Sequence, residues 1–363
     1  MSTFIPPTHT TYRRAPGTPS PSTPLPLIRT TEPTLPPSGL SPTQVLLRIH
    51  AVSLNYRDVL IPRGTYPGVA LPNGIPASDC AAEVVLVGSA VTRVKVGDRV
   101  CPTFDLVNLD GVIRGDGSHE ALGGEVDGVL REWAVFEERV LVRLPGHLGW
   151  EEAATVSCAG ITAWNASGMG EGVEGKEGKT VLIQGTGGVS MFSLLIALAA
   201  GMKPIVTSSS DEKLESLRAK LGMPELMGFN YRTHPDQAAE VKKLTGGRGV
   251  DLIVDNTGPS GFPANLDSLV SQRGVISIVG FLAGMTADWN PGLLLGLIGK
   301  TARLQGIAVG SRDDFDALNR FLEEKKVSLA PLVDQHIFDF KDSQAAFDYL
   351  WSGKHVGKVV IRV

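Results

Sequence analysis

The sequence has little cysteine, which excludes a disulfide framework. Only three cysteines, Cys80, Cys101 and Cys158, occur among 363 residues. They are too few and too scattered to staple a fold, and such sparse use fits a reducing compartment. We therefore expect a cytoplasmic protein. Cys158 is expected to be a small core residue, because nothing near it in the sequence would activate its thiol.

The sequence also lacks a strong charge imbalance and a long apolar run. Its 34 Lys and Arg against 38 Asp and Glu leave a formal net charge of −4. That balance gives no electrostatic basis for binding nucleic acid or an anionic membrane. No apolar run reaches the ~20 residues that a membrane-spanning helix needs. The length and the 42% apolar content instead predict a globular protein of two domains.

The first part of the chain is rich in proline, serine and threonine. Residues 1 to about 43 are predicted to be irregular or edge structure. Arg13 and Arg14 among Ser and Thr leave a transit peptide as an alternative, although the prolines argue against an amphipathic helix.

A β-rich region follows. Residues 45–52, 81–88, 94–100 and 131–136 are predicted strands because they are rich in β-branched residues and lie between glycine-containing turns. Between them, residues 104–130 form a loop dense in Gly and Asp, and long loops in compact domains are usually functional or disordered. The pattern indicates an antiparallel β domain with little helix.

The chain is organised around a glycine-rich turn at its centre. An apolar strand at 181–183 leads into Gly185-Thr186-Gly187-Gly188, and an apolar helix at 189–200 follows. Glycine lets the backbone approach a pyrophosphate, and the helix N-terminus offers free N–H groups. The third glycine of the dinucleotide-binding pattern is replaced by Ser190. An ordinary strand–turn–helix without a ligand is the alternative.

The end of the next strand, at 205–207, indicates which dinucleotide would bind. An NAD site needs a carboxylate there for the ribose hydroxyls, whereas this chain has Ser208 and Ser209, with Lys213 one helical turn further on. Hydroxyls and an ammonium suit the 2′-phosphate of NADPH. Asp211 is the competing ribose ligand, but we expect it in the first turn of a helix, where the dipole favours an acid.

The remainder alternates between strands and helices. Strands are predicted at 250–255, 274–279 and 302–309, and they complete an α/β, doubly wound parallel sheet. Helices are predicted at 313–326 and 343–351, and a last strand at 358–361. His355 and Lys358 are expected to be solvated ends of a terminal hairpin.

Several segments resemble one enzyme family. They are SLNYRDVL at 53–60, GTYP at 64–67, CAGITAW at 158–164, VLIQGTGGVS at 181–190, GRGVDLIVDNTG at 247–258 and GKVVIRV at 357–363. Over almost the whole chain the sequence resembles the medium-chain dehydrogenase/reductase superfamily, and within it the zinc-free quinone oxidoreductase branch. The resemblance implies a β-rich GroES-like catalytic domain, residues 1–158 and 312–363, and a Rossmann domain, residues 159–311. The proline-rich N-terminus departs from the family pattern.

The resemblance also bears on zinc. Zinc alcohol dehydrogenases of this superfamily have a cysteine where this chain has Asn55, and a His-Glu pair where it has Ser78-Asp79. Asn and Ser are poor zinc ligands. The loop that carries four cysteines for the structural zinc has only Cys101 here, and His119 is expected to be solvated. We therefore expect no metal at either site.

The resemblance implies the remaining site residues. Asn55 and Thr162 would lie beside the nicotinamide, and Tyr231 would help to hold the 2′-phosphate. Tyr66 would donate to a developing enolate, the alternative being a tyrosine that merely packs against the β domain. The full cofactor set is Asn55, Thr162, Gly185, Thr186, Gly187, Gly188, Val189, Ser208, Ser209, Lys213, Tyr231, Asn256, Gly280, Phe281, Ile307, Val309 and Ser311.

The sequence therefore predicts an NADPH-dependent reductase without a metal, acting on a quinone or an α,β-unsaturated carbonyl in a cleft between the domains. Without a Lewis acid, oxidation of a simple alcohol is disfavoured, whereas reduction of a conjugated carbonyl needs less activation. By resemblance a homodimer would form through the Rossmann edge strands near 280–309. An enoyl-thioester reductase and a catalytically silent NADPH-binding protein are the alternatives.

Overall fold

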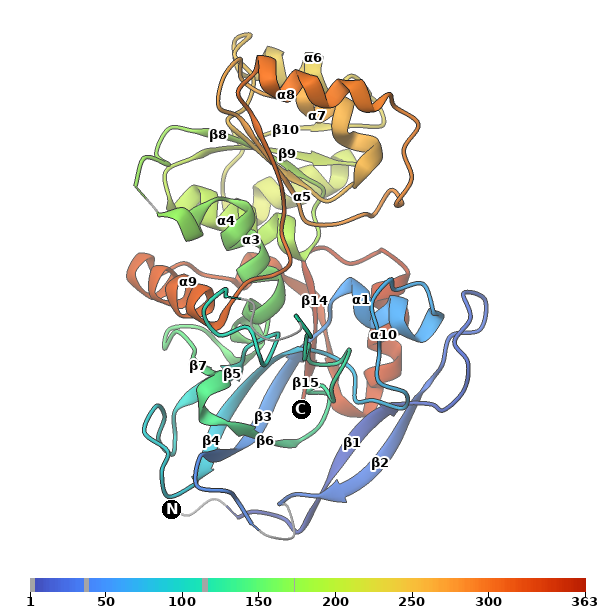
Figure 1. Ribbon diagram of the computed structural model, residues 1–363, viewed down its shortest axis with the longest axis vertical. Coiled ribbons are helices and arrows are strands. Elements are labelled where there is room, and N and C mark those ends of the chain that lie inside the picture. Colours follow the sequence, from blue (N-terminus) through green and yellow to red (C-terminus); the bar gives the residue numbers. More distant parts are fainter. Residues whose placement is uncertain (1–3, 36–38, 113–116, 173) are drawn as a thin grey trace. The chain divides into compact units, whose positions relative to one another are not determined.

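The computed structural model describes residues 4–35, 39–112, 117–172 and 174–363, so part of the predicted 104–130 loop lies outside the described residues. The chain forms two compact units (Figure 1). The first comprises Met1–Ile161 and Gly310–Val363, and the second comprises Thr162–Val309. The second unit thus begins at 162 rather than at the expected 159, and it ends at 309 rather than 311.

The first unit is built on a seven-stranded sheet, which the sequence predicted as a β-rich domain. Its strand order is β14-β15-β3-β4-β5-β7, and β6 pairs with β3. The last strand of the chain, β15, pairs antiparallel with β3, so the C-terminus completes the N-terminal sheet. The strands are β3 (Gln44–Ser53), β4 (Asp79–Val87), β5 (Arg99–Pro102), β6 (Trp133–Glu137), β7 (Leu141–Arg143), β14 (Val333–Asp339) and β15 (Lys358–Arg362).

One predicted strand of this unit, residues 94–100, is mostly a turn. The N–H of Asp98 donates to the carbonyl of Lys95, and the carboxylate of Asp98 accepts from the N–H of Lys95. Gly97 has φ +88°, which takes the backbone out of the extended region. The strand β5 therefore begins only at Arg99.

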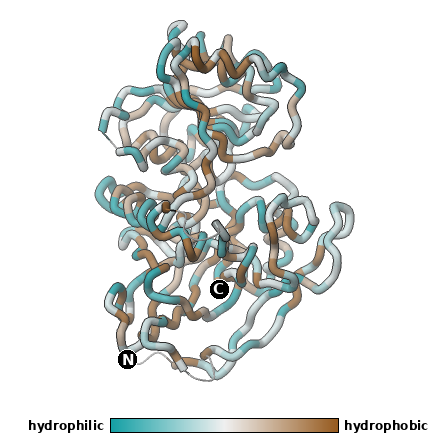
Figure 2. The backbone as a smooth tube through the Cα atoms, in the orientation of Figure 1, coloured by the Kyte–Doolittle hydropathy of each residue, from teal (hydrophilic) through white to brown (hydrophobic). Residues whose placement is uncertain are grey.

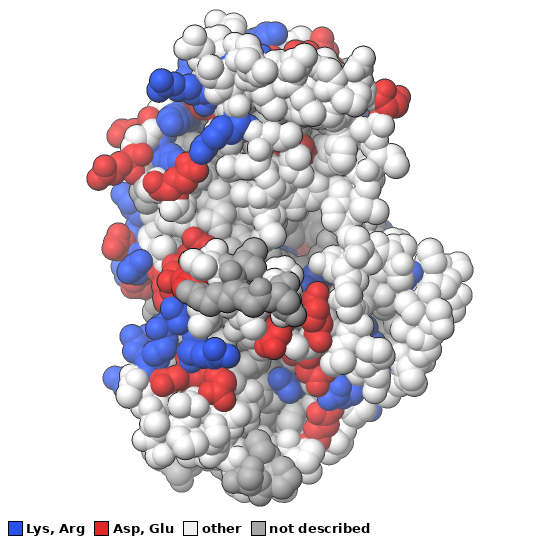
Figure 3. Space-filling model, in the orientation of Figure 1, with Lys and Arg blue, Asp and Glu red and all other residues white. Residues whose placement is uncertain are grey.

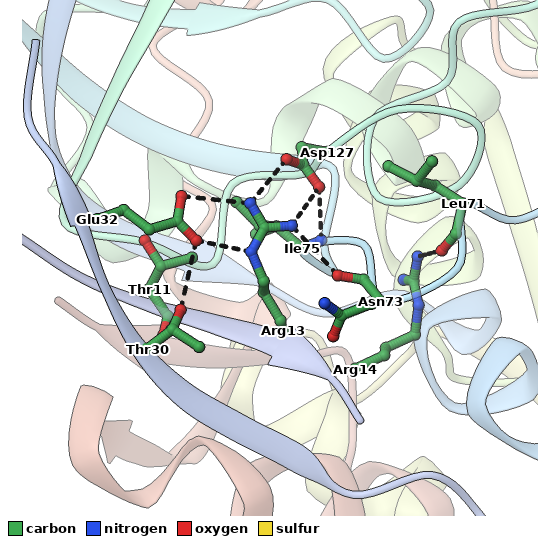
Figure 4. A network of polar contacts seen from close by, with 9 residues as sticks. All are labelled: Thr11, Arg13, Arg14, Thr30, Glu32, Leu71, Asn73, Ile75 and Asp127. Carbon is green, nitrogen blue, oxygen red and sulfur yellow. Dashed lines mark hydrogen bonds and ion pairs between the residues drawn. The ribbon is translucent and has the colours of Figure 1, made fainter. Parts of the chain in front are cut away.

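The proline-rich N-terminal segment contains an ordered two-stranded sheet, rather than only irregular structure. Strands β1 (Thr8–Arg14) and β2 (Leu27–Pro33) pair antiparallel along their whole length. Figure 4 shows how the guanidinium of Arg13 lies between two carboxylates, at 2.6 Å from Glu32 and 3.0 Å from Asp127. The contact with Asp127 ties the sheet to a residue 114 positions further along the chain.

Short helices complete the first unit. The two longest lie in its C-terminal segment, and α9 begins with a capping box between Ser311 and Asp314. The helical segments are α1 (Tyr56–Leu60), η1 (Ile61–Arg63), η2 (Glu138–Val140), α2 (Trp150–Ala153), η3 (Val156–Gly160), α9 (Arg312–Lys325), η7 (Ala330–Leu332), η8 (Phe340–Asp342) and α10 (Ser343–Trp351). Helix α3 (Ile161–Ala166) follows at the boundary and leads into the second unit.

The second unit is a six-stranded parallel sheet in the order β10-β9-β8-β11-β12-β13. This order is that of the Rossmann fold, which binds ligands at the carboxyl ends of the strands where the order reverses. The reversal lies between β8 and β11. The strands are β8 (Thr180–Gln184), β9 (Lys203–Ser208), β10 (Met227–Asn230), β11 (Leu252–Asp255), β12 (Val275–Ile278) and β13 (Arg303–Gly306).

Helices cover both faces of this sheet, as Figure 1 shows with α4 below the strands and α6 and α7 above them. The core against α6 and α7 is apolar and includes Leu182, Ile205, Phe262 and Leu266. No helix of the described residues has the length and apolar character to span a bilayer. The helical segments are η4 (Met169–Glu171), α4 (Gly188–Ala199), α5 (Asp211–Leu221), α6 (Gln237–Leu244), η5 (Pro259–Gly261), α7 (Phe262–Ser268), η6 (Pro291–Leu295) and α8 (Gly296–Gly299).

Candidate functional site

The glycine-rich turn lies at the carboxyl end of β8, next to the point where the strand order reverses. Gly185 has φ +83°, a conformation that a residue with a Cβ adopts only with strain. Gly187 is the N-cap of the 12-residue helix α4, so the free N–H groups of the first helical turn lie at this position. No heavy atom lies within 4 Å of a Cβ built on Gly187. The backbone at Gly187 is therefore open to a close approach, and the predicted contact with a pyrophosphate stays a prediction.

Ser190 is bonded within this turn. Its hydroxyl donates to the carbonyl of Gln184 at 2.8 Å and accepts from the side-chain amide of Asn256 at 3.2 Å. The same amide also donates to the carbonyl of Gln184 at 3.1 Å. Serine at the third glycine position therefore joins the first turn to the end of β11, and a glycine there would lose these bonds. Asn256 is held beside the turn by the same contacts.

The carboxyl ends of β9 and β10 bring two predicted 2′-phosphate ligands together. Ser208 pairs with Asn230 in the parallel ladder, and the N–H of Tyr231 donates to the carbonyl of Ser208 at 3.0 Å. The side chain of Ser208 is buried and accepts from the N–H of Ser210 at 3.2 Å. Tyr231 is 47% exposed, so its ring is accessible to a ligand. Ser209 and Lys213 are half-buried on the segment that follows β9.

Asp211 is the first residue of α5, which confirms its expected place in the first turn of a helix. Its carboxylate accepts from the side-chain amide of Asn230 at 3.0 Å. Ser210 caps the same helix through the N–H of Lys213. Asp211 thus has a local structural partner and a favourable position at the helix N-terminus.

The ends of β12 and β13 carry the other predicted cofactor residues. Gly280 follows β12, and a Cβ there would lie 3.2 Å from the carbonyl oxygen of Asn256, which follows β11. The N–H of Leu282, next to Phe281, donates to that same carbonyl. Ile307 extends the parallel ladder beyond β13, and the side-chain amide of Asn165 donates to the carbonyl of Val309 at 2.9 Å. The carboxyl ends of the strands therefore place these residues along one edge of the sheet.

Thr162 and Ser311 are placed differently from the strand-end residues. Thr162 is buried within α3, at the start of the second unit. Ser311 belongs to the first unit, where its hydroxyl caps α9 and also donates to the carboxylate of Asp314 at 2.8 Å. That structural role uses the Ser311 hydroxyl, so its predicted contact with a cofactor stays a prediction.

A second candidate centre lies in the first unit, around Asp79 at the start of β4. The carboxylate of Asp79 is fully buried and accepts from the hydroxyls of Ser78 at 2.7 Å and Ser157 at 3.0 Å. The ammonium of Lys358, from β15, lies 3.1 Å from the other oxygen of the same carboxylate. It also donates to the amide oxygen of Asn55 at 2.5 Å. We call Asn55, Ser78, Asp79, Ser157 and Lys358 the Asp79 cluster.

The expectation that Lys358 is a solvated end residue is wrong. Lys358 is only 3% exposed, because β15 lies between β14 and β3 in the sheet. A buried charge is costly unless it is paired, and Asp79 pairs with it. The available sequence signal was the position of Lys358 directly before the apolar run Val359–Ile361. The pairing of β15 with β3, which brings the lysine to Asp79, is not visible in the sequence.

The backbone of Asn55 is fixed by a second carboxylate. Asp58 accepts from the N–H of Asn55 at 2.8 Å and from that of Ala77 at 3.1 Å. Burial raises the pKa of Asp58, although Arg57 and the bond from Asn55 act in the opposite direction. Close by, burial and the charge of Asp79 raise the pKa of the Cys158 thiol to about 12. Cys158 therefore keeps its proton at neutral pH, in agreement with its expected inert role.

Tyr66 is not joined to the Asp79 cluster. It follows η1 and is half-buried, and among the described residues its hydroxyl makes no hydrogen bond to a member of the cluster. A phenol must come within hydrogen-bond reach of its substrate to act as an acid, so the role of Tyr66 stays a prediction.

The residues at the positions compared with the zinc ligands of alcohol dehydrogenases are poor metal ligands. Asn55 and Ser78 supply an amide and a hydroxyl, and the ammonium of Lys358 lies directly against the amide. Over the described parts of the chain, no group of three or more His, Cys, Asp and Glu side chains is arranged to hold a metal ion. The side chain of His119 is 60% exposed, and its Nδ1–H donates to the carboxylate of Asp105 at 2.7 Å.

Comparison with known proteins agrees with this architecture of two units. The family model described as an alcohol dehydrogenase GroES-like domain matches residues 41–146, and that described as a zinc-binding dehydrogenase matches residues 188–324. A zinc-type alcohol dehydrogenase-like protein of Schizosaccharomyces pombe is 38% identical over 90% of this chain and 93% of its own length. A quinone oxidoreductase of Pseudomonas aeruginosa is 32% identical over 71% of each chain.

Solved structures show the same fold. An alcohol dehydrogenase structure from Sinorhizobium meliloti superposes with a TM-score of 0.86 at 35% identity, covering 99% of this chain and all of the other. An NAD-dependent alcohol dehydrogenase gives 0.79 at 28% identity, covering 98% and 99%. The fold and the dinucleotide turn define a nicotinamide-dependent oxidoreductase. The chain belongs to the medium-chain dehydrogenase/reductase superfamily.

Proposed function

We propose that this oxidoreductase uses NADPH to reduce a quinone or an α,β-unsaturated carbonyl, and that it does so without a metal. The observation that carries the proposal is the Asp79 cluster, in which a buried ammonium stands against the residues expected at a zinc site. A relative that shares 32% identity is named a quinone oxidoreductase. Other relatives are named alcohol dehydrogenases, so the metal and the acceptor are the points that experiment must decide.

The electrostatics of the Asp79 cluster disfavour zinc. The ammonium of Lys358 is 2.5 Å from the oxygen of Asn55 and would repel a divalent cation bound to that oxygen. Structural and catalytic zinc sites use thiolate, imidazole or carboxylate ligands, and the carboxylate of Asp79 is already occupied by two hydroxyls and the ammonium. The residues therefore do not fit zinc, and we derive no step that requires it.

The second unit fits a dinucleotide, and its residues favour NADPH. The turn Gly185–Gly188 and the N-terminus of α4 would hold the pyrophosphate. Ser208, Ser209, Lys213 and Tyr231 would surround a 2′-phosphate. No carboxylate follows β9 until Asp211, which the amide of Asn230 engages. When bound, NADPH supplies the hydride; Thr162, Asn256 and the segments at 280–281 and 307–309 would orient its nicotinamide half.

The chain's own groups would stabilise the negative charge that hydride addition produces. A carbonyl or quinone oxygen becomes anionic as the hydride reaches the conjugated system, and a positioned N–H donor lowers the energy of that state. The side-chain amide of Asn55 is the accessible donor of the Asp79 cluster, because Asn55 is half-buried whereas Ser78, Asp79, Ser157 and Lys358 are buried. Tyr66 is proposed to donate the proton.

The proposal includes a homodimer formed through the edge of the second unit. Strand β13 has a neighbour on one side only in the sheet order. Beside it, η6 and α8 form a mostly brown, apolar stretch in Figure 2 and a largely uncharged surface in Figure 3. Contiguous patches of exposed apolar side chains commonly mark protein interfaces. The exposed apolar residues in this region are Leu282, Met285, Leu293, Leu294, Leu295, Ile298 and Leu304.

A cytoplasmic location also belongs to the proposal. The three cysteines are all free, and Cys80 and Cys101 are fully buried as thiols. A hydrogen bond with Cys101 and burial raise the pKa of Cys80, so that its thiol stays protonated. A sequence with few cysteines and no disulfide framework is typical of a reducing compartment.

A titration and an acceptor panel test the proposal. Nicotinamide fluorescence should show that NADPH binds at least tenfold more tightly than NADH, a difference of about 1.4 kcal/mol. The absorbance of NADPH should then decrease with quinones or enones and not with simple aldehydes. Activity confined to enoyl thioesters would support the first alternative. A stoichiometric NADPH complex without turnover on any acceptor would support a catalytically silent protein and contradict the proposed activity.

A further inference from the structure

The ammonium of Lys358 contacts a neutral side chain, Asn55, in addition to the carboxylate that neutralises its charge. The carboxylate of Asp79 already compensates the ammonium of Lys358, yet the ammonium also contacts the side-chain amide of Asn55, at 2.5 Å. The contact joins residues 303 positions apart in the chain. Asn55 is the one member of the Asp79 cluster whose side chain is not fully buried. Lys358 thus links the buried carboxylate of Asp79 to Asn55, the accessible side chain of the cluster.

This contact fixes which way the Asn55 amide points. An ammonium has three N–H donors and no acceptor, so only the amide oxygen can face it. The amide nitrogen must then lie on the other side, where one of its hydrogens is directed to the hydroxyl of Ser78 at 3.3 Å. That hydroxyl in turn donates to Asp79. The second hydrogen of the amide nitrogen is left for a ligand.

The same contact makes the amide a stronger donor. A positive charge at the amide oxygen draws electrons from the amide nitrogen, and hydrogen bonds arranged in a chain polarise one another. Asp79 holds the ammonium in place, and Ser78 and Ser157 hold Asp79. The backbone of Asn55 is fixed separately by Asp58. The amide is therefore oriented before any substrate binds, which is the property of an effective oxyanion site.

We infer that Lys358 is a positioning residue that orients and polarises the amide of Asn55, so that Asn55 donates an N–H to the oxygen on which negative charge develops. This inference rests on the proposed reduction and names the donor used in it. In that reduction, bound NADPH would supply a hydride to the β-carbon of an enone and become NADP⁺. The C=C electron pair would move toward the carbonyl, whose oxygen would become the enolate oxygen held by Asn55. A proton from Tyr66, the proposed donor, would then return to the α-carbon.

The test uses three changes to the full-length protein. Asn55→Asp keeps an oxygen for Lys358 but removes the N–H donor. The pair Lys358→Met with Asp79→Asn removes both buried charges together and leaves neither unpaired. Lys358→Arg retains a cation that donates hydrogen bonds and accepts none, so it should preserve the orientation of the Asn55 amide. The matched control is Arg362→Met with Glu151→Gln, which removes an ion pair of 2.7 Å on the same strand, β15, outside the cluster.

The first measurement does not depend on turnover. 4-Nitrophenol is bound to each variant, and the absorbance of its phenolate form is followed against pH. An oxyanion site should bind the phenolate preferentially and lower the apparent pKa of the bound phenol. We expect this shift in the unaltered protein, in the control pair and largely in Lys358→Arg. We expect its loss in Asn55→Asp and in the Lys358/Asp79 pair.

The second measurement is the steady-state rate with the best acceptor of the panel. Loss of one oxyanion donor costs about 10²-fold in kcat, so Asn55→Asp should show a loss of this order with unchanged NADPH affinity. The Lys358/Asp79 pair should lose roughly tenfold, since its amide still exists but is no longer oriented. An equal phenol shift in all variants, or no phenol binding by the unaltered protein, would overturn the inference. A phenol shift that depends on Asn55 and Lys358 in a protein without turnover would support the inference and reject the proposed reduction.

Discussion

Lys358 and Asp79 are separated by 279 positions in the chain, yet their ammonium and carboxylate lie 3.1 Å apart with both side chains buried. The contact is possible because β15 pairs with β3 and β3 pairs with β4. It places a fixed positive charge in the part of the first unit where zinc enzymes of this superfamily are expected to bind their metal. The ion pair is therefore part of the fold, and the proposed metal-free reduction depends on it.

Because Lys358 and Asp79 form a buried ion pair, replacing one of them should lower the free energy of unfolding more than replacing both. Lys358→Met alone leaves the buried carboxylate of Asp79 without its partner, which typically costs about 3–5 kcal/mol. Combining it with Asp79→Asn removes the unpaired charge and should recover much of that loss. Denaturant unfolding followed by a probe in the first unit measures both. Equal destabilisation by the single and double variants would show that the charges are not coupled.

The preference for NADPH over NADH should depend on the side chain at position 209, which follows β9. Ser209→Asp places a carboxylate near the proposed 2′-phosphate position, so the affinity for NADPH should fall by at least tenfold while that for NADH is kept or improved. Nicotinamide fluorescence measures both constants. Lys203→Asp is the control, because it introduces the same carboxylate at the opposite, exposed end of β9. If Ser209→Asp leaves NADPH binding unchanged, the phosphate site lies elsewhere.

The N-terminal hairpin should be held less firmly in acid. Burial acts to raise the pKa values of Asp127 and Glu32, but the hydrogen bonds and charge of Arg13, together with other hydrogen bonds and the charge of Arg131, lower both values below their ordinary 3.8 and 4.5. These carboxylates therefore stabilise the fold above their ordinary pKa values, and that contribution is lost as the pH falls through the lowered ones. The hydrogen-exchange protection factor of the Tyr12 amide, which donates to the carbonyl of Leu130, should fall over that range.

Arg13→Met provides the control for this pH dependence. Without the guanidinium, the two carboxylates lose the interaction that lowers their pKa values, so the hairpin should already be weakened at neutral pH. The protection factor of the Tyr12 amide should then depend less on pH below about 4.5. The same pH dependence in Arg13→Met and in the unaltered protein would assign the effect to other groups.

The proposed dimer depends on the exposed apolar segment beside β13. Ile298 is 73% exposed, and Ile298→Asp would place a charge in the proposed interface. Light scattering should show a dimer for the unaltered protein and a monomer for Ile298→Asp. Val96→Asp, at an apolar residue that is 58% exposed in the first unit, should leave the dimer intact. A monomeric unaltered protein would reject the dimer.

Local patterns were sufficient to predict most strands of the second unit and its helix α4, although strand β10 was not predicted. The glycine turn, the apolar helix after it and the alternation of strands and helices are encoded within short segments, and the structure confirms α4 and the parallel sheet. Asp251, directly before β11, likewise pairs with Arg248 only three positions away, at 2.6 Å. In each case the residues that interact are close in sequence, so their spacing carries the information.

Long-range pairing is what the sequence did not reveal. Arg13 meets Asp127 across 114 positions, and Lys358 meets Asp79 across 279. A lysine before an apolar run and a proline-rich segment both have ordinary solvent-exposed interpretations. Only the strand order shows that one is buried in the sheet and that the other contains the ordered β1–β2 hairpin. The Asp79 cluster is composed of just such distant residues, which is why its ammonium was missed.

Reduction without zinc is tested most directly by measuring metal content and turnover on the same sample. The protein would be treated with a strong zinc chelator, its zinc determined by elemental analysis, and NADPH oxidation then followed with the best quinone or enone. Our account predicts less than one zinc per ten chains and an unchanged kcat, with no gain when zinc is restored. Stoichiometric zinc in the protein as purified, together with activity that disappears on chelation and returns with zinc, would contradict it.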